Sequence, residues 1–240
     1  EVRQYATRVV GLRDLTPDIK EVRLQLVDPP AITFKAGQFI QFEVPPYDLT
    51  DEPVYRAYSI ASPPSASGEI ELEIRAVPNG LCTTYVHRHL RVGDVVTING
   101  PYGDFTLRDT DREILCVAGG SGMAPIKSIL TEMAEQRNPR KVRYFYGARA
   151  RADLAAYDAI RALESALPDF SFIPALSAPG PDDGWRGETG RITDVMDRHV
   201  EKAPEAEAYL CGSPFLIDAC IQRLTAKGLP MERIYYDKFA

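Results

Sequence analysis

The hydrophobic pattern of this chain changes near residue 110, and that change constrains the fold more than any other feature. Before it, short segments alternate apolar and polar residues, as in "EVRLQLV" (21–27). After it, continuous apolar runs such as "EILCVAG" (113–119) precede amphipathic stretches. Alternation is typical of strands with one buried face, whereas a buried strand followed by a helix is typical of a parallel sheet covered on both faces. The sequence therefore predicts two domains, residues 1–108 and 109–240.

The first domain is predicted to be an antiparallel β-barrel. Its alternating segments are short and closely spaced, and they are bounded by Pro, Gly, Asp and Asn, which favours a barrel or sandwich. One stretch, 82–92, has helical periodicity. The expected strands are 6–12, 21–27, 37–44, 56–62, 69–77 and 94–100.

The second domain is predicted to be an α/β domain with a five-stranded parallel sheet. Ligands of such sheets bind at the carboxyl ends of the strands. The expected strands are 113–119, 142–148, 170–177, 206–212 and 233–239, and the expected helices lie near 124–137, 152–166, 190–200 and 214–227. The fold class is thus an all-β domain followed by an α/β domain.

Composition excludes several classes of function. A formal net charge of -6 argues against a protein that binds the phosphate backbone of nucleic acids. No stretch approaches the about 20 apolar residues of a membrane span. The four cysteines and three histidines have no metal-ligand spacing, so we expect no metal site and free thiols in a reducing compartment such as the cytoplasm.

The segment "CVAGGSGMAP" (116–125) predicts a phosphate site. A buried strand ends at Gly119, Gly120 and Gly122, and Pro125 suits the first turn of the next helix. The free N–H groups of that turn favour an anion. A tight strand-to-helix connection would explain the glycines equally well. However, "YLCGSPF" (209–215) repeats the arrangement at another strand end, so the two openings favour a groove for an extended ligand.

The first domain carries a second candidate site in "YRAYSIASPP" (55–64). The i, i+2 spacing places Arg56 and Tyr58 on one strand face. An arginine can bind a diphosphate, a tyrosine can cover an aromatic ring, and the Ser59 hydroxyl can bond a ring nitrogen. An exposed polar strand face is the simpler alternative. In "PNGLCTTYVHRHL", Thr83 or Thr84 fits a helix cap, and the same helix start fits a phosphate.

Together these segments resemble the ferredoxin–NADP reductase superfamily. "RAYSIA" is similar to its R-x-Y-S flavin motif, "GLCTTY" to its G-x-x-S/T diphosphate turn, "GGSGMAP" to its nicotinamide-nucleotide turn and "CGSP" to its C-G-x-P segment. All four occur in family order over nearly the whole chain. Within the superfamily the chain resembles the reductase components of bacterial multicomponent oxygenases, such as phenol hydroxylase and methane monooxygenase, and the subunit named F of the sodium-translocating NADH:quinone reductase.

The resemblance implies an enzyme, a flavoprotein oxidoreductase that uses NADH to reduce FAD. It implies catalytic roles beside the reacting rings for Ser59, Cys211 and Phe239. It implies FAD contacts for one set of residues: Arg56, Ala57, Tyr58, Ser59, Arg75, Gly80, Cys82, Thr83, Thr84 and Phe239. It implies nicotinamide-dinucleotide contacts for another set: Gly119, Gly120, Gly122, Met123, Pro125, Arg149, Cys211, Gly212 and Pro214.

The choice of coenzyme is open from the residues alone, because Arg149 and Arg151 suit the 2′-phosphate of NADPH whereas Asp153 suits a free ribose. The resemblance favours NADH over NADPH.

The resemblance also implies electron transport to an iron–sulfur partner. Relatives carry a [2Fe–2S] domain with C-x4-C-x2-C, which this chain lacks, so either such a domain precedes Glu1 or the acceptor is separate. A location in the cytoplasm, or at the cytoplasmic face of a membrane complex, follows from the same relatives. Two alternatives stay open: a free-standing flavin or ferric reductase, and a regulatory module without turnover.

Overall fold

The computed structural model describes residues 1–239. The chain divides into two compact units. One consists of Glu1–Leu107 with Lys127–Glu132, and the other of Arg108–Ile126 with Met133–Ala240.

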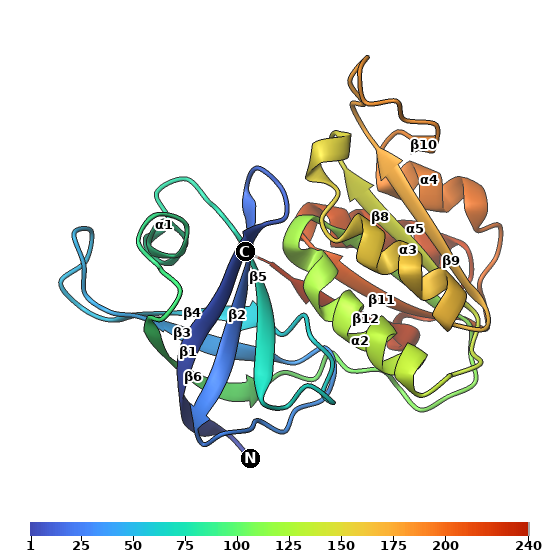
Figure 1. The fold of residues 1–240 in the computed structure, drawn as a ribbon. Helices are drawn as coiled ribbons and strands as arrows, with labels where there is room; N and C mark the ends of the chain where they lie inside the picture. Colours follow the sequence, from blue (N-terminus) through green and yellow to red (C-terminus); the bar gives the residue numbers. More distant parts are fainter. Residues whose placement is uncertain (240) are drawn as a thin grey trace. The chain divides into compact units, whose positions relative to one another are not determined.

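The first unit is built on a six-stranded antiparallel sheet with the strand order β4-β3-β6-β1-β2-β5 (Figure 1). An isolated bridge between Ile60 and Leu72 joins the ends of that order, so the sheet closes into the predicted barrel. The strands are β1 (Arg3–Asp14), β2 (Ile19–Asp28), β3 (Phe39–Val44), β4 (Val54–Ser59), β5 (Glu69–Arg75) and β6 (Val95–Tyr102), and one helix, α1 (Leu81–Arg88), follows β5.

Alternation explains these strands. In β3, the residues Ile40, Phe42 and Val44 are wholly buried while their neighbours are half-buried. The inward side chains of the other strands and of α1 complete one apolar core, which includes Leu24, Leu72 and Val86. Burial of this continuous apolar surface is the main force that holds the barrel closed.

The second unit is a six-stranded parallel sheet with the strand order β10-β9-β8-β7-β11-β12. Its strands are β7 (Ile114–Gly119), β8 (Val142–Ala148), β9 (Phe170–Leu176), β10 (Glu188–Thr189), β11 (Glu207–Gly212) and β12 (Ile234–Lys238). Its helices are α3 (Tyr157–Ala166), α4 (Ile192–His199), α5 (Pro214–Ala226) and the two ends of α2 (Met123–Glu135), whose middle residues Lys127–Glu132 are grouped with the first unit. Three short 3-10 helices lie at Gly120–Gly122 (η1), Arg151–Asp153 (η2) and Met231–Arg233 (η3).

Helices cover both faces of this sheet, as Figure 1 shows. On one face α4 and α5 pack over Val117, Phe145 and Leu210 in a single buried cluster. The central strands β7 and β11 are buried along almost their whole length, since their residues meet helices on both sides. The four cysteines are free and buried, and Cys116 and Cys220 fill core space as small apolar residues.

Two details of the second unit differ from the sequence prediction. The sheet has a sixth strand, because the two residues of β10 pair with Ala175 and Leu176 of β9. Two residues are too few to produce a hydrophobic pattern. The helix expected from residue 152 begins at Tyr157 instead, because Ala156 adopts a left-handed conformation with φ 54° and interrupts the helical path.

Glu73 is an unusual feature of the barrel. It faces outward on β5 opposite Glu21 of β2, yet its side chain is buried and neither carboxylate oxygen has a hydrogen-bond partner. Burial raises the pKa of Glu73 to about 7; Lys127 of the same unit opposes that rise, and Glu21 and Glu71 reinforce it. An ionised carboxylate is costly in such surroundings, so the folded state favours the protonated acid.

The variant Glu73→Gln should therefore change how stability depends on pH. Because the folded pKa of Glu73 is raised, its contribution to stability is present below the usual carboxyl pKa and is lost as the pH rises through about 7. Glutamine stays neutral, so the variant should not lose this stability as the pH rises. The difference between its free energy of unfolding and that of wild type should therefore increase by about 2 kcal/mol from pH 5 to pH 8. Urea denaturation at both pH values measures this. Glu69→Gln on the same strand is the control, and an equal rise there would contradict the prediction.

Candidate functional site

The start of α1 and the strand β4 form one cluster in the first unit. The Tyr58 hydroxyl donates to the Cys82 Sγ at 3.2 Å, and the Tyr58 ring packs edge-on against Phe42. Burial raises the pKa of Tyr58 well above its usual value. Burial also raises the pKa of the Cys82 thiol to about 11, although the hydrogen bond from Tyr58 and the charge of Arg56 oppose that rise. Phenol and thiol are therefore neutral, and the charge of the cluster is that of Arg56.

Arg56 is exposed on β4, where its guanidinium donates to the carbonyl oxygen of Tyr55. Ala57 is exposed beside it, and Ser59 is buried at the end of the strand. The first turn of α1 has no acidic residue and no side-chain cap. A free helix start next to an arginine is a good environment for an anion.

The G-x-x-T spacing has a local explanation. The Thr83 hydroxyl accepts the backbone N–H of Val77 at 3.2 Å, which folds the turn before α1. A Cβ at Gly80 would overlap both the Thr83 hydroxyl and the Val77 side chain. Neither Thr83 nor Thr84 caps the helix, so the capping alternative is wrong for both.

Tyr47 is a contributor that the sequence analysis missed. It lies in the loop between β3 and β4, its hydroxyl donates to the carbonyl oxygen of Leu81, and its ring contacts Tyr85 and His89. Tyr47 and Tyr58 thus both hold the first turn of α1. No periodicity in "PPYDLTD" indicates this contact. Arg75, in contrast, is engaged with Asp18 at 2.8 Å, and no described contact joins it to the Arg56 cluster.

The glycine turn of the second unit lies directly against the C-G-S-P segment. A Cβ at Gly122 would overlap the carbonyl oxygen of Cys211, so the two backbones touch with no side chain between them. The Tyr146 hydroxyl donates to the Gly120 carbonyl at 2.9 Å and holds the turn in place. Gly212 has φ 147°, a conformation that other residues rarely adopt.

The residues around this contact are equally well defined. Ser213 caps α5 by accepting the N–H of Leu216, and Pro214 is the first residue of that helix. The backbone N–H of Phe239 donates to the Gly212 carbonyl at 2.8 Å, which brings the last described residue to the same strand end. Cys211 is wholly buried, and burial raises the pKa of its thiol well above the usual value, so the group is a neutral thiol.

Three further predicted residues have clear positions. The Met123 side chain is buried, with its sulfur 3.6 Å from the Tyr144 hydroxyl, and Pro125 is buried in the first turn of α2. Arg149 is exposed just after β8. The groove lined by Asp111–Glu113 and Lys202–Ala206 lies at the opposite ends of β7 and β11, away from the glycine turn.

The structure thus brings the predicted residues together in two separate sets, one in each unit. In the first unit Arg56, Tyr58 and Cys82 meet at the start of α1. In the second unit Gly122, Cys211 and Gly212 meet at the ends of β7 and β11. Each set combines a helix start with a backbone turn, which fits a diphosphate in either unit.

Two family models match the chain: "Oxidoreductase FAD-binding domain" over residues 6–107 and "Oxidoreductase NAD-binding domain" over residues 116–222. The chain is 39% identical over 242 residues to the propane 2-monooxygenase reductase component of Mycolicibacterium goodii, covering 99% of this chain and 68% of that protein. It is 40% identical over 240 residues to the phenol hydroxylase P5 protein of Acinetobacter pittii, covering 99% and 66%.

A more distant relative is the subunit named F of the Na(+)-translocating NADH-quinone reductase of Methylococcus capsulatus, 34% identical over 279 residues and covering 99% of this chain and 68% of that protein. The solved structure of the Amycolatopsis cytochrome P450 reductase GcoB superimposes with a TM-score of 0.90 at 28% identity, covering 99% of this chain and 70% of that one. The chain therefore spans about two thirds of the length of these proteins. Within residues 1–239, no helix combines the length and the apolar character that crossing a bilayer requires.

The close approach at Gly122 can be tested directly. Gly122→Ala should destabilise the second unit by about 1–3 kcal/mol, the usual cost of overpacking, because the Cys211 backbone cannot move aside as a side chain would. It should also weaken NAD⁺ binding measured by calorimetry. Gly119→Ala in the same turn is the matched control for stability, since its Cβ would meet the end of the flexible Leu216 side chain at 3.3 Å and the Gly147 carbonyl oxygen only at 3.7 Å, an ordinary contact distance. Equal losses of stability in both variants would show that the backbone contact is unimportant.

Proposed function

The chain belongs to the family of ferredoxin reductase-like oxidoreductases, in which an FAD-binding domain is joined to an NAD-binding domain, and on that premise we propose that it takes hydride from NADH and passes electrons to an iron–sulfur acceptor. The observation that carries the proposal is the presence, in each matched domain, of a helix that follows a tightly packed glycine turn and whose first turn holds no acidic side chain.

The first unit fits FAD. Arg56 and the first turn of α1 would hold the diphosphate, because a guanidinium and free N–H groups both favour phosphate oxygens. The half-buried ring of Tyr58, kept in place by Cys82, would cover the isoalloxazine. Ser59 would place a hydroxyl at flavin N5, and exposed Ala57 leaves room beside it. Gly80, Thr83 and Thr84 would shape the diphosphate turn, and we assign residues 1–108 to this FAD-binding domain.

The second unit fits NADH. The turn at Gly119, Gly120 and Gly122 would let the dinucleotide approach the backbone, and Pro125 lies in the first turn of the helix behind it, where it adds no unused N–H group. Cys211, Gly212 and Pro214 would border the nicotinamide, with Phe239 held at Gly212. We assign residues 109–240 to this domain.

Hydride transfer from NADH requires little acid or base catalysis from the protein. Bound FAD supplies an acceptor that takes two electrons as hydride and releases them singly. The residues of the chain bind, orient and exclude water. Tyr58, Cys82 and Cys211 suit that role because all three are neutral and both cysteines are buried, so they add no charge that would attract water to the rings.

The acceptor is proposed to be a [2Fe–2S] centre of the ferredoxin type, either in the same polypeptide or in a partner protein. The support is that the relatives are reductase components of oxygenases and a component of a quinone reductase. We also propose a cytoplasmic location, which suits four free buried thiols.

The proposal is tested with the purified protein. It should show flavin absorbance, or take up FAD on reconstitution, and NADH should bleach that absorbance under anaerobic conditions. Addition of a plant-type [2Fe–2S] ferredoxin should then restore the flavin spectrum as the ferredoxin is reduced. Protein that neither contains nor takes up FAD would refute the assignment. Reduction of free flavin or ferric ion with no transfer to any iron–sulfur protein would refute the acceptor.

Ser59→Ala should slow the reduction of bound flavin by NADH about tenfold, because one hydrogen bond at the reacting nitrogen is worth about 1.4 kcal/mol. Stopped-flow absorbance measures the rate. Flavin content should stay near that of wild type, since Arg56 and α1 hold the diphosphate. Ser59→Thr retains the hydroxyl and should recover most of the rate; an unchanged rate in the alanine variant would remove this role from Ser59.

A further inference from the structure

A tight turn closes the loop that follows β9 in the second unit. The backbone N–H of Gly180 donates to Asp183 Oδ2 at 2.7 Å, and the N–H of Asp183 donates to the Gly180 carbonyl at 3.2 Å. Gly184, the next residue, has φ 59°. The Asp183 carboxylate therefore shapes the turn from Gly180 to Gly184, which we name the 180–184 turn.

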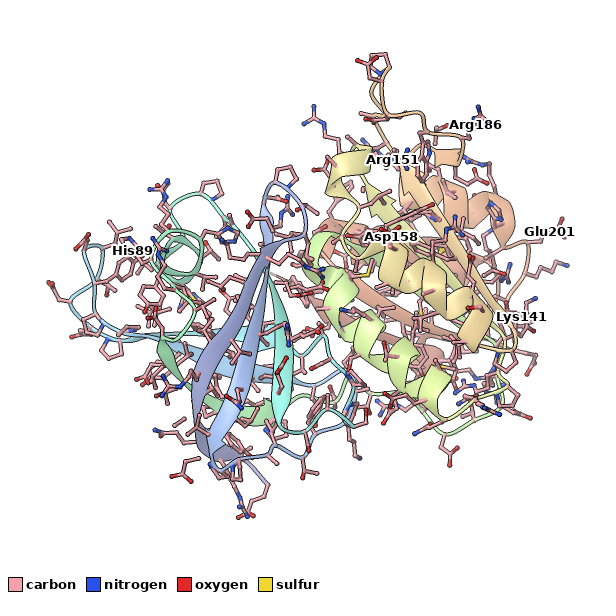
Figure 2. All side chains as sticks on the ribbon, viewed as in Figure 1. His89, Lys141, Arg151, Asp158, Arg186 and Glu201 are labelled. Carbon is pink, nitrogen blue, oxygen red and sulfur yellow. The ribbon has the colours of Figure 1, made fainter. Side chains whose placement is uncertain are left out.

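Arg151 is hydrogen-bonded to the 180–184 turn. Its guanidinium Nη1 donates to the carbonyl oxygen of Asp183 at 2.9 Å, and its backbone N–H lies 3.4 Å from Asp183 Oδ2. Figure 2 marks Arg151 at the start of η2, and it marks Arg186 in the loop that contains the turn. The neighbouring Asp153 accepts the N–H of Ala150 at 3.0 Å with one carboxylate oxygen, Oδ2.

The loop beyond the turn is folded on itself. The Trp185 Nε1 donates to the Glu188 carbonyl at 2.8 Å, and the ring packs edge-on against Tyr157. The ring also lies so close to Gly187 that a Cβ there would overlap it. Trp185 therefore closes its own loop, so the position of the turn does not require a ligand.

The place of Arg151 matters because it follows β8, the second strand of the nucleotide-binding half. In doubly wound sheets the adenosine ribose of a dinucleotide lies just past the end of that strand. NADPH has a phosphate on the 2′ oxygen of this ribose, whereas NADH has a hydroxyl there. A cation recognises the phosphate, and a carboxylate accepts the hydroxyl. Arg149, Arg151 and Asp153 all lie in this segment.

We propose that Asp183 determines the choice of coenzyme as a positioning residue. By shaping the 180–184 turn, it holds the Arg151 guanidinium on a backbone carbonyl and away from the 2′ position. The segment after β8 then presents the carboxylate of Asp153 to the 2′-hydroxyl of the ribose. Arg151 is not available to bind the 2′-phosphate of NADPH. This inference rests on the proposed function, since it requires a nicotinamide dinucleotide at the end of β8.

The test uses the full chain and two probes of the adenosine half, 5′-ADP and 2′,5′-ADP, with dissociation constants from titration calorimetry. Wild type should prefer 5′-ADP. In Asp183→Ala the turn loses its carboxylate and Arg151 is released, so affinity for 2′,5′-ADP relative to 5′-ADP should rise about tenfold. The matched control Asp183→Asn keeps an oxygen that accepts the Gly180 N–H, and its preference should equal that of wild type. An unchanged preference in Asp183→Ala would overturn the proposal.

Two further variants tie the effect to Arg151. The double variant Asp183→Ala with Arg151→Ala should lose the gain, and a gain that survives would overturn the proposal. Arg151→Ala alone should change the preference by less than about twofold, as for a surface residue without a ligand contact. A clear loss of 2′,5′-ADP binding in that variant would show that Arg151 already contacts the phosphate, which also overturns the proposal.

Coenzyme kinetics provide a second readout. The ratio of kcat/KM for NADPH to that for NADH should rise in Asp183→Ala in parallel with the calorimetric preference. If wild type binds neither probe and NADH does not reduce its flavin, the proposed function fails, and this inference fails with it. If NADH reduces wild type normally and the ratio is the same in Asp183→Ala, only the role of Asp183 is lost.

Discussion

The close contact between two strand-end turns supports the second unit's candidate site. Gly122 lies on the carbonyl of Cys211 with no side chain between, so the helix starts of α2 and α5 open at one edge of the sheet. Neighbouring bonds fix both partners: Tyr146 holds Gly120, and Phe239 holds Gly212. Close backbone packing of this kind is stiff, because no rotamer can relax it. A stiff pair of turns suits a protein whose main task is alignment.

In the first unit, the neutral polar groups of the candidate site are buried and its charged group is exposed. The Tyr58 phenol and the Cys82 thiol are held neutral by burial, while Arg56 stays exposed and charged beside the start of α1. Two tyrosine hydroxyls, those of Tyr47 and Tyr58, hold the first turn of this short helix. A fixed set of N–H groups suits an anion, and a neutral surface suits an aromatic ring. The proposed flavin dinucleotide has both kinds of group.

The sequence predicted much of this because its patterns are local. Alternation in β3 and the apolar runs of β7 and β11 indicated the strands directly, and glycines with proline at 119–125 indicated the turn. Features made by distant residues were missed. The two residues of β10 carry no pattern and form a strand only by pairing with β9, and Tyr47 contacts Leu81 across 34 positions. The role of Arg151 was equally open, since it depends on a loop conformation.

By itself the sequence determined the two kinds of sheet, the order of the four motifs and the residue types suited to a diphosphate in each half, since hydrophobic period and turn chemistry act over a few neighbouring residues. The tertiary structure alone decided which of those residues meet. It brought the Gly122 backbone against the Cys211 carbonyl and the Thr83 hydroxyl to the N–H of Val77. It also buried the Glu73 carboxylate without a hydrogen-bond partner and joined the Arg151 guanidinium to the carbonyl of Asp183. The reason is physical: burial, backbone overlap and the direction of a hydrogen bond are properties of residues that folding brings together.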